Sequence, residues 1–259
     1  MMVFGLASAA SAEEKAIVIG LDYTNAKDAR LRLSNPVRDA QEIAASFRRA
    51  KVDNVTLLTE PSESEFWNGL ESYANSLTSD DVAVIFYAGH AVQYEGENFL
   101  VAGDGETLIN LIDMIDQINQ RAKATVLIVD ACRNSPYDGI GSGSRSLRVS
   151  NGQATRSITT DVIAKDGGLA QVGDLRGLST VVFFSTEPGN VAIDGEAGKG
   201  SPFAKVLAKE IRKRQSLDDL LRRTAVRVNK MTDGAQSPWR QGDIPFDVFL
   251  AGMKTMVIP

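Results

Sequence analysis

The residues best suited to nucleophilic chemistry in this sequence are its one histidine, His90, and its one cysteine, Cys132. A cysteine acts as a nucleophile when a base holds it as the thiolate, and in hydrolases that base is usually a histidine. The alternative is that Cys132 is a small buried hydrophobic residue and His90 an ordinary loop residue. The choice depends on whether the fold brings the two together.

Both residues follow short runs that are typical of buried parallel strands. Residues 81–89 (DVAVIFYAG) lead to His90, and residues 124–131 (ATVLIVDA) lead to Cys132. Both runs are rich in hydrophobic residues and do not alternate with polar ones, as expected for strands covered on both faces. Catalytic groups gather at the carboxyl ends of such strands. We therefore expect His90 and Cys132 at one edge of a sheet, with one crossover helix between their strands.

Strand-like and helix-like segments alternate along most of the chain. Strands are predicted at 16–22, 54–59, 81–89, 124–131 and 179–186, with a hairpin over 91–103 that turns at Glu95 and Gly96. Helices are predicted from Pro36 onwards and over 63–78, 108–121, 201–214 and 217–231, the last opened by a capping box of Ser216 and Asp219. This order predicts an α/β fold with a mostly parallel sheet and helices on both faces.

The composition is that of an ordinary globular protein. Of the 259 residues, 43% are hydrophobic and 24% are charged, and the net charge is -5. An acidic chain lacks the basic footprint of a nucleic-acid-binding protein, and no apolar run approaches the roughly 18 residues of a membrane helix. We therefore expect neither nucleic acid nor membrane as a partner.

The first twelve residues, MMVFGLASAASA, are small and apolar like a signal peptide but lack a basic n-region. A disordered extension is the alternative. A signal peptide would make the protein periplasmic or secreted, and otherwise it would be cytoplasmic. The single cysteine cannot form an internal disulfide and gives no further indication. Later in the chain, residues 134–178 have little periodicity, and irregular stretches of that length are usually functional or disordered.

The surroundings of His90 and Cys132 resemble those of the caspase-like cysteine peptidases, especially the bacterial orthocaspases related to metacaspases. The segments FYAGHAVQYEGENFLV and LIVDACRNSPY resemble the family's histidine and cysteine motifs. Further matches in family order are AIVIGLDYTNA, LSNPVRDAQEIAASF, VVFFSTEPGNVAIDG and SPWRQGDIPF. The resemblance implies a three-layer α/β sandwich with a mostly parallel six-stranded sheet. It also implies one domain over 13–259, made of a p20-like part (13–140), a linker (141–177) and a p10-like part (178–259).

The resemblance makes Cys132 the nucleophile and His90 the general acid/base of a cysteine endopeptidase, with no third catalytic residue evident. The backbone N–H groups of Ala91 and Cys132 would form the oxyanion hole. The family usually has glycine in place of Ala91. Alanine keeps the N–H group, but it would impair the hole if the site needed a conformation that only glycine adopts.

The resemblance further implies an acidic primary pocket built from Asp39 and Asp130, with Ala88 beside them. Asp130 and Cys132 are two positions apart on a strand and so share one side of it, and a carboxylate can accept the fork of an arginine. Asp39 alone could equally be a solvated residue of a helix first turn. With the pocket, the enzyme would cut polypeptides after Arg or Lys.

Calcium binding, common among metacaspases, depends on aspartates after the histidine strand. The corresponding stretch here, VAGDGETLINLIDM, lacks paired aspartates, and we interpret Asp104, Glu106 and Asp113 as loop and cap residues. We expect no metal and no other cofactor. The oligomeric state is open, and a monomer is favoured.

The linker is often cut during maturation in this family. Its basic residues are candidate sites of self-cleavage: Arg145, Arg148, Arg156, Lys165 and Arg176. A passive linker is the alternative. For the whole chain, the alternatives to a peptidase are a catalytically inactive caspase-like scaffold that binds partners through the same cleft, and a thiol hydrolase of another bond, such as an amidase.

Overall fold

The computed structural model describes residues 13–132, 146–150, 155–159, 169, 171–173, 175, 177–188, 190 and 192–251. The side chains of residues 132, 155, 156, 158 and 159 are not among the described ones.

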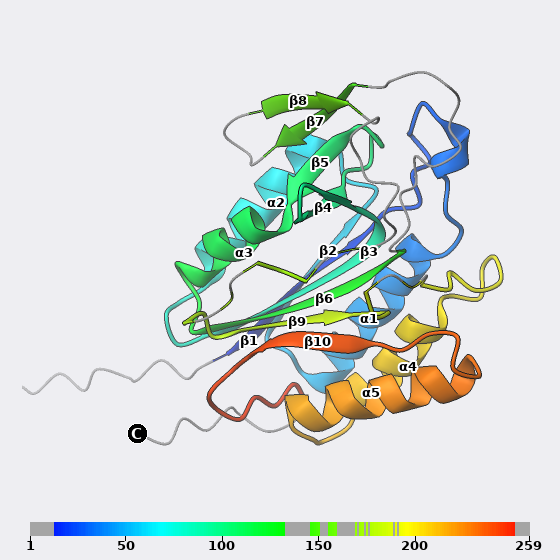
Figure 1. Cartoon of the computed structure of the whole chain (residues 1–259). Helices are drawn as coiled ribbons and strands as arrows, with labels where there is room; N and C mark the ends of the chain where they lie inside the picture. Colours follow the sequence, from blue (N-terminus) through cyan, green and yellow to red (C-terminus); the bar gives the residue numbers. More distant parts are fainter. Residues whose placement is uncertain are drawn as a thin grey trace, which may run out of the picture.

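A ten-stranded sheet runs through the middle of the molecule (Figure 1). Its larger part contains five parallel strands in the order β2 (Asn54–Thr59), β1 (Glu14–Gly20), β3 (Val82–Tyr94), β6 (Ala124–Cys132) and β9 (Thr180–Phe184). The antiparallel strand β10 (Trp239–Asp243) follows β9. The predicted mostly parallel sheet is confirmed for this part.

The prediction of six strands is nevertheless too low, because the sheet continues beyond them. The end of β3 pairs with β4 (Glu97–Val101), which pairs with β5 (Thr107–Asn110). Beyond β5 lie β7 (Ser146–Ser150) and β8 (Thr155–Thr159). The predicted hairpin turn is confirmed, since Glu95 and Gly96 join β3 to β4 with positive φ angles of 50° and 81°.

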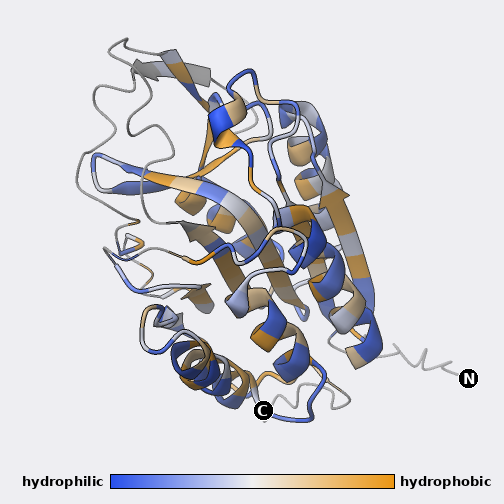
Figure 2. Ribbon diagram, turned by 90° about the vertical axis from the view of Figure 1, so that its right-hand side faces the viewer, coloured by the Kyte–Doolittle hydropathy of each residue, from blue (hydrophilic) through white to orange (hydrophobic). Residues whose placement is uncertain are grey.

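Helices cover both faces of the sheet, as predicted. One face carries α1 (Pro36–Ala50), α4 (Pro202–Ile211) and α5 (Leu217–Met231), and the other carries α2 (Glu63–Ser76) and α3 (Leu111–Asn119). Alternate residues of the parallel strand β3 enter opposite cores: Val84 and Phe86 pack under α1, while Ile85 and Tyr87 face the side of α2 and α3. Figure 2 shows the hydrophobic strands enclosed between helices with hydrophilic outer faces.

Local capping decides where several helices begin. The prediction of a helix over 108–121 is wrong for residues 108–110, which belong to β5. The Asn110 side chain accepts hydrogen bonds from the N–H groups of Ile112 and Asp113, and this cap starts α3 at Leu111. The capping box predicted at α5 is half formed. Ser216 accepts from the N–H of Asp219, whereas the Asp219 carboxylate binds Arg222.

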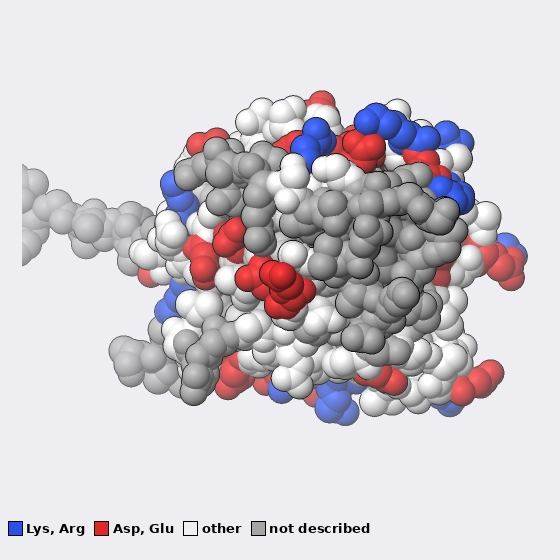
Figure 3. Space-filling view, turned by 45° about the horizontal axis from the view of Figure 1, so that its top comes forward, with Lys and Arg blue, Asp and Glu red and all other residues white. Residues whose placement is uncertain are grey.

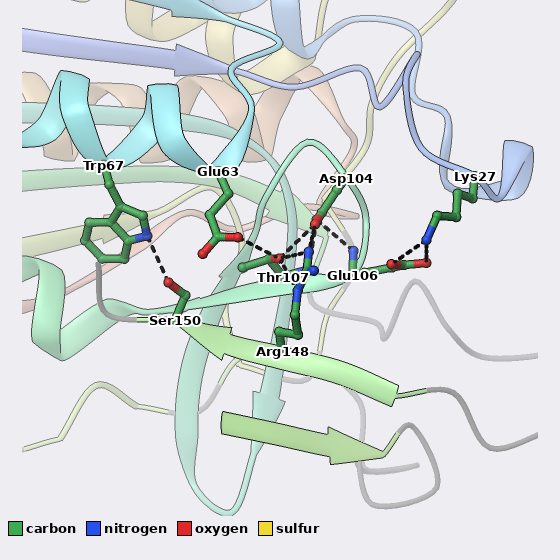
Figure 4. Close-up of polar contacts among 8 residues, drawn as sticks. All are labelled: Lys27, Glu63, Trp67, Asp104, Glu106, Thr107, Arg148 and Ser150. Carbon is green, nitrogen blue, oxygen red and sulfur yellow. Dashed lines mark hydrogen bonds and ion pairs between the residues drawn. The ribbon is translucent and has the colours of Figure 1, made fainter. Parts of the chain in front are cut away.

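Part of the segment predicted to be irregular is a β-hairpin, β7–β8. Leu147 and Val149 are buried, while Arg148 between them points outward and binds the Asp104 carboxylate and the Thr107 hydroxyl (Figure 4). The indole N–H of Trp67 on α2 donates to the Ser150 hydroxyl at 3.1 Å. The prediction fails here because five residues give too short an alternating pattern to be distinguished within a region rich in Gly and Ser.

Charged side chains of both signs are interspersed over the described part of the face seen in Figure 3. Within the described ranges, no helix is both long and apolar enough to cross a membrane.

Candidate active site

His90 lies where β3 changes its pairing partner. From Val82 to His90 the strand runs parallel to β6, and from Ala91 onwards it pairs with the antiparallel β4. In the parallel register His90 lies directly opposite Cys132, the last residue of β6. The structure therefore brings the backbones of the two predicted catalytic residues side by side, although His90 lies inside its strand and not after it. The side chain of Cys132 is outside the described atoms.

Two buried tyrosines hold the backbone of His90. The hydroxyl of Tyr23 accepts a hydrogen bond from the His90 N–H at 2.7 Å, and the hydroxyl of Tyr87 donates to the His90 carbonyl at 2.7 Å. The two hydroxyls lie 2.9 Å apart. A Cβ atom on Gly89 would meet these hydroxyls at 2.7–2.8 Å, so a glycine is needed beside the tyrosine pair.

The connection between β1 and α1 reaches over the imidazole of His90. Tyr23, which has a left-handed backbone with a φ of 59°, places its ring 4.6 Å from the His90 ring. The carbonyl of Leu31 lies 2.8 Å from Nε2. A carbonyl only accepts, so Nε2 carries the proton and the lone pair of the neutral ring is on Nδ1.

Burial keeps the imidazole of His90 uncharged. The residue is 7% exposed, and this desolvation lowers its pKa to about 4, although the hydrogen bond to the Leu31 carbonyl acts in the opposite direction. At neutral pH the ring is therefore an uncharged base whose lone pair is on Nδ1.

Ala91 follows His90 as an ordinary strand residue. It pairs with Leu100 of β4, is buried, and does not have a positive φ. The backbone at this position is thus accessible to any L-residue, and the alanine causes no strain of the kind that only a glycine would relieve.

A small acidic pocket opens two residues before His90 and Cys132 on the same two strands. Ala88 of β3 is paired with Asp130 of β6, and both line the pocket together with Asp39 of α1. The pocket volume is about 20 Å³, which is room for about one water molecule. The three predicted pocket residues therefore do lie together.

Two further pocket residues, Asp194 and Ser201, were missed by sequence reasoning. The segment that carries Asp194 is fastened to the start of α1. The carboxylate of Asp194 accepts a hydrogen bond from the N–H of Ser34 at 3.3 Å, and the carbonyl of Asp194 accepts one from the side-chain amide of Asn35 at 2.8 Å. Asn35 also accepts from the N–H of Gly200 at 2.9 Å, so it joins two chain segments and does not cap its own helix.

The pocket carboxyl groups are hard to ionise. Desolvation, followed by the nearby charge of Asp130, raises the pKa of Asp39 to about 7. Desolvation also raises the pKa of Asp130 to about 6, against the opposing effect of its hydrogen bond from Ser201. The pKa of Asp194 is raised as well, mainly by burial.

The alternative interpretation of Asp39 as a solvated helix residue is wrong, since it is 4% exposed and its carboxylate accepts from the N–H of Ser201 at 2.9 Å. One part of the site that was not predicted, the connection between β1 and α1, had a signal in the sequence. The connection between β1 and α1, residues 21–35, is much longer than the usual two to six residues of such loops, and long loops are often functional. Asp194 and Ser201 gave no comparable signal.

The acidic residues considered for calcium have other partners. Asp104 accepts from the N–H groups of Glu106 and Thr107 and binds Arg148, which lowers its pKa against the effect of burial, and Glu106 binds Lys27 (Figure 4). Asp113 lies in the first turn of α3. Within the described ranges, no group of three or more His, Cys, Asp or Glu residues could hold a metal ion.

The candidate self-cleavage sites fall mostly outside the described residues. Arg145, Lys165 and Arg176 lie there entirely, as does the side chain of Arg156 in β8. Arg148 is described, and it belongs to the hydrogen-bonded strand β7 and not to irregular chain as expected.

Comparison with known proteins agrees with this arrangement. Among solved structures, the chain resembles the crystal structure of a protein from Geobacter sulfurreducens, with a TM-score of 0.63 and 16% sequence identity over 95% of this chain and 100% of that one. That likeness concerns the fold alone. No curated protein matches the sequence. A family profile of the caspase domain matches residues 13–249, nearly all of the described chain. The chain therefore belongs to the caspase-domain family of cysteine peptidases, and its sheet and helices form the corresponding fold.

Proposed function

We propose that this protein is a cysteine endopeptidase that cleaves polypeptides after arginine or lysine. The observation that carries the proposal is the acidic pocket, formed by Asp39, Asp130 and Asp194, directly beside the register pair of His90 and Cys132. Family membership supports the peptidase chemistry, and the charge of the pocket supports the substrate class.

In the proposed reaction His90 acts first as a base. Its Nδ1 takes the thiol proton of Cys132, and the thiolate attacks the carbonyl carbon of the scissile bond. The tetrahedral intermediate collapses, His90 gives its proton to the leaving amine, and a thioester remains. Water, deprotonated by His90, then attacks the thioester, and the thiol and the new carboxylic acid are released.

The carbonyl of Leu31 and the two tyrosines would keep the imidazole in place during this cycle. The Leu31 carbonyl fixes the tautomer in which Nδ1 is the base, and it can stabilise the imidazolium that forms in each half-reaction. The backbone N–H groups of Ala91 and Cys132 are proposed to receive the oxyanion. The negative φ range of Ala91 supports this role, since no glycine-only conformation is required there.

The pocket favours a cationic side chain because it has carboxylates on several sides. A guanidinium fork can bind a carboxylate through two parallel hydrogen bonds, and an ammonium can bind it as a point charge. An aspartate side chain would instead face like charges at Asp39 and Asp130. At its present volume of about 20 Å³ the pocket must widen to admit arginine, and the partly exposed Ile193 and Leu33 form the walls that would move.

Self-processing of the linker follows from the same preference. A protease needs extended chain that can leave its own hydrogen bonds, which disfavours Arg148 and Arg156, because both belong to the paired strands of the β7–β8 hairpin. The other candidates, Arg145, Lys165 and Arg176, lie outside the described residues. The fragments would remain together, because β9 from the C-terminal part lies between β6 and β10 in the sheet.

The narrowness of the pocket also favours one alternative, a caspase-like scaffold without peptidase activity. The two are separated by hydrolysis of fluorogenic peptides ending in Arg, Lys or Asp, by wild type and by Cys132→Ala. We expect turnover of the Arg and Lys peptides by wild type alone. Absence of turnover of every peptide would favour the scaffold, and preference for Asp would overturn the role of the carboxylates.

A further inference from the structure

Ser201 connects the two carboxylates that the pocket takes from different parts of the fold. Its backbone N–H donates to Oδ2 of Asp39 at 2.9 Å, and its hydroxyl donates to Oδ2 of Asp130 at 2.7 Å. The same hydroxyl accepts from the N–H of Ala204 and so caps α4. Ser201 is 3% exposed, so water does not replace these contacts.

These hydrogen bonds act against the other forces in the pocket. Burial is the main cause that favours the protonated forms of Asp39 and Asp130, and the charge of a neighbouring carboxylate adds to it, from Asp130 at Asp39 and from Asp194 at Asp130. Close carboxyls in a dry site tend to share a proton. A donor to a carboxylate oxygen stabilises the ionised form. Ser201 donates to Asp39 from its N–H group and to Asp130 from its hydroxyl. Each carboxylate therefore has its own donor, and the two do not have to share a proton.

The remaining charged groups around the pocket do not supply this function. Asp194 and Asp22 bring further negative charge to it. Among the described residues, the guanidinium of Arg38 lies close to Gly200, but it belongs to an exposed side chain of α1. Among the described residues that line the pocket, Ser201 is the one that donates to both Asp39 and Asp130.

We propose that Ser201 is a positioning residue that holds Asp39 and Asp130 apart and ionised, ready for a cationic substrate side chain. The statement about the substrate rests on the proposed function, whereas the effect on the carboxylates does not. Because Ser201 begins α4, which packs beside α1 (Figure 1), the acidic pocket depends on the C-terminal part of the chain for its charge state as well as its shape.

The direct test is a titration of the Asp130 carboxyl carbon by NMR in protein labelled with 13C at the aspartate side chains, with the signal assigned through its loss in Asp130→Asn. Removing a hydrogen bond to the charged carboxylate in Ser201→Ala should raise the midpoint by about one pH unit. Ser201→Gly, which retains most of the capping preference, should give the same shift, and Ser201→Thr, which keeps the hydroxyl, should give little.

Ser216→Ala is the matched control. Ser216 caps α5 as Ser201 caps α4, but it does not line the pocket, so its replacement should cost similar stability and leave the Asp130 midpoint unchanged. An unchanged midpoint in Ser201→Ala and Ser201→Gly, or an equal shift in Ser216→Ala, would overturn the proposal.

Hydrolysis of an arginine peptide gives the second readout. Ser201→Ala should raise KM about tenfold near pH 6.5 with little change in kcat, and the rise should shrink at pH 8.5, where the carboxylates are ionised in both proteins. An equal loss in kcat at both pH values would indicate a general structural role and would contradict the positioning role. If wild type cleaves no peptide, the proposed function fails, but the titration still decides the role of Ser201.

Discussion

The surroundings of His90 and the neighbouring acidic pocket lie two residues apart on the same two strands, and burial affects them in the same way with opposite results. Burial favours the uncharged form of each group. For His90 this lowers the pKa to about 4 and leaves the imidazole unprotonated at neutral pH, as the proposed reaction requires. For Asp39 and Asp130 it raises the pKa to about 7 and about 6, which weakens the attraction for a cation.

This difference indicates which group should limit peptide hydrolysis at physiological pH. With a pKa of about 4, His90 is neutral from pH 6 to 8, so its titration in the free protein should not affect activity there. The carboxylates titrate within that range, and substrate binding should improve as they lose their protons. The partners also differ: His90 is held by tyrosine hydroxyls and a carbonyl, whereas Asp39 and Asp130 both accept hydrogen bonds from Ser201.

The largest loss of activity is expected from substitutions at His90 and Cys132. Replacing His90 or Cys132 with alanine should reduce kcat for an arginine peptide by about a thousandfold or more, because the base or the nucleophile is lost. Stopped-flow or long-term fluorogenic assays can measure the loss. A His90→Ala protein that keeps a tenth of the wild-type rate would show that another group acts as the base.

The next effect concerns the pocket. Asp130→Asn should lower kcat/KM for an arginine peptide by about a hundredfold, since a charge-assisted hydrogen bond and the negative charge beside the guanidinium are lost. Most of this loss should appear in KM. Asp113→Asn, in the first turn of α3 and not part of the pocket lining, is the control and should behave like wild type. Comparable losses in both variants would contradict the specificity role.

Asp39 should show that the pocket reduces the stability of the fold. Its raised pKa means that the folded protein binds this proton more tightly than the unfolded chain does. Ionisation of Asp39 therefore lowers the free energy of unfolding as the pH rises from about 4, and the loss is complete only above the pKa of about 7 that Asp39 has in the folded protein. Asp39→Asn should therefore raise the free energy of unfolding at pH 8 by about 3 kcal/mol while weakening substrate binding. The gain should vanish near pH 3 in urea unfolding experiments. A variant that is less stable at pH 8 would refute this account of Asp39.

The tyrosine pair permits a finer test of the histidine side. Tyr87→Phe removes the hydroxyl that donates to the His90 carbonyl, and we expect about a tenfold lower kcat with KM nearly unchanged, because the imidazole is held less firmly. Steady-state kinetics at pH 7.5 would measure both constants. A change confined to KM would place the tyrosine with the pocket and not with the histidine.

The smallest effect is expected far from either region, at Arg148. Its partly exposed ion pair with Asp104 should contribute about 1 kcal/mol or less, so Arg148→Ala should lower the midpoint of urea unfolding only slightly. It should leave the pH dependence of KM unchanged. A shifted pH profile would mean that the β7–β8 hairpin communicates with the pocket.

Sequence reasoning predicted the parts of the fold that depend on patterns of six or more residues. The hydrophobic runs before His90 and Cys132 gave both strands and the edge where they meet, and the turn at Glu95 and Gly96 gave the hairpin. It failed for β5 and β7, where four or five residues pair only because neighbouring strands are already in place. Propensity over so few positions is easily overridden by tertiary contacts.

The site was predictable to the extent that it lies on strand ends. Asp130 could be placed beside Cys132 from their spacing, and Asp39 from the family resemblance. Asp194 and Ser201 could not, because they reach the pocket from a connection more than 60 residues later in the chain, and only the packed positions of α1 and α4 bring them there. The carbonyl of Leu31 is a backbone group, and no sequence pattern marks it.

The central claim is that ionised carboxylates select a cationic side chain. It is tested most directly with two peptides that differ only at the residue before the cleaved bond, arginine in one and its uncharged isostere citrulline in the other, measured from pH 5 to 9. We expect kcat/KM to favour arginine by a factor that grows as pH rises through 6 to 7, while citrulline hydrolysis stays low and shows no such rise. Equal rates for the two peptides, or a ratio that does not change across this range, would contradict the account.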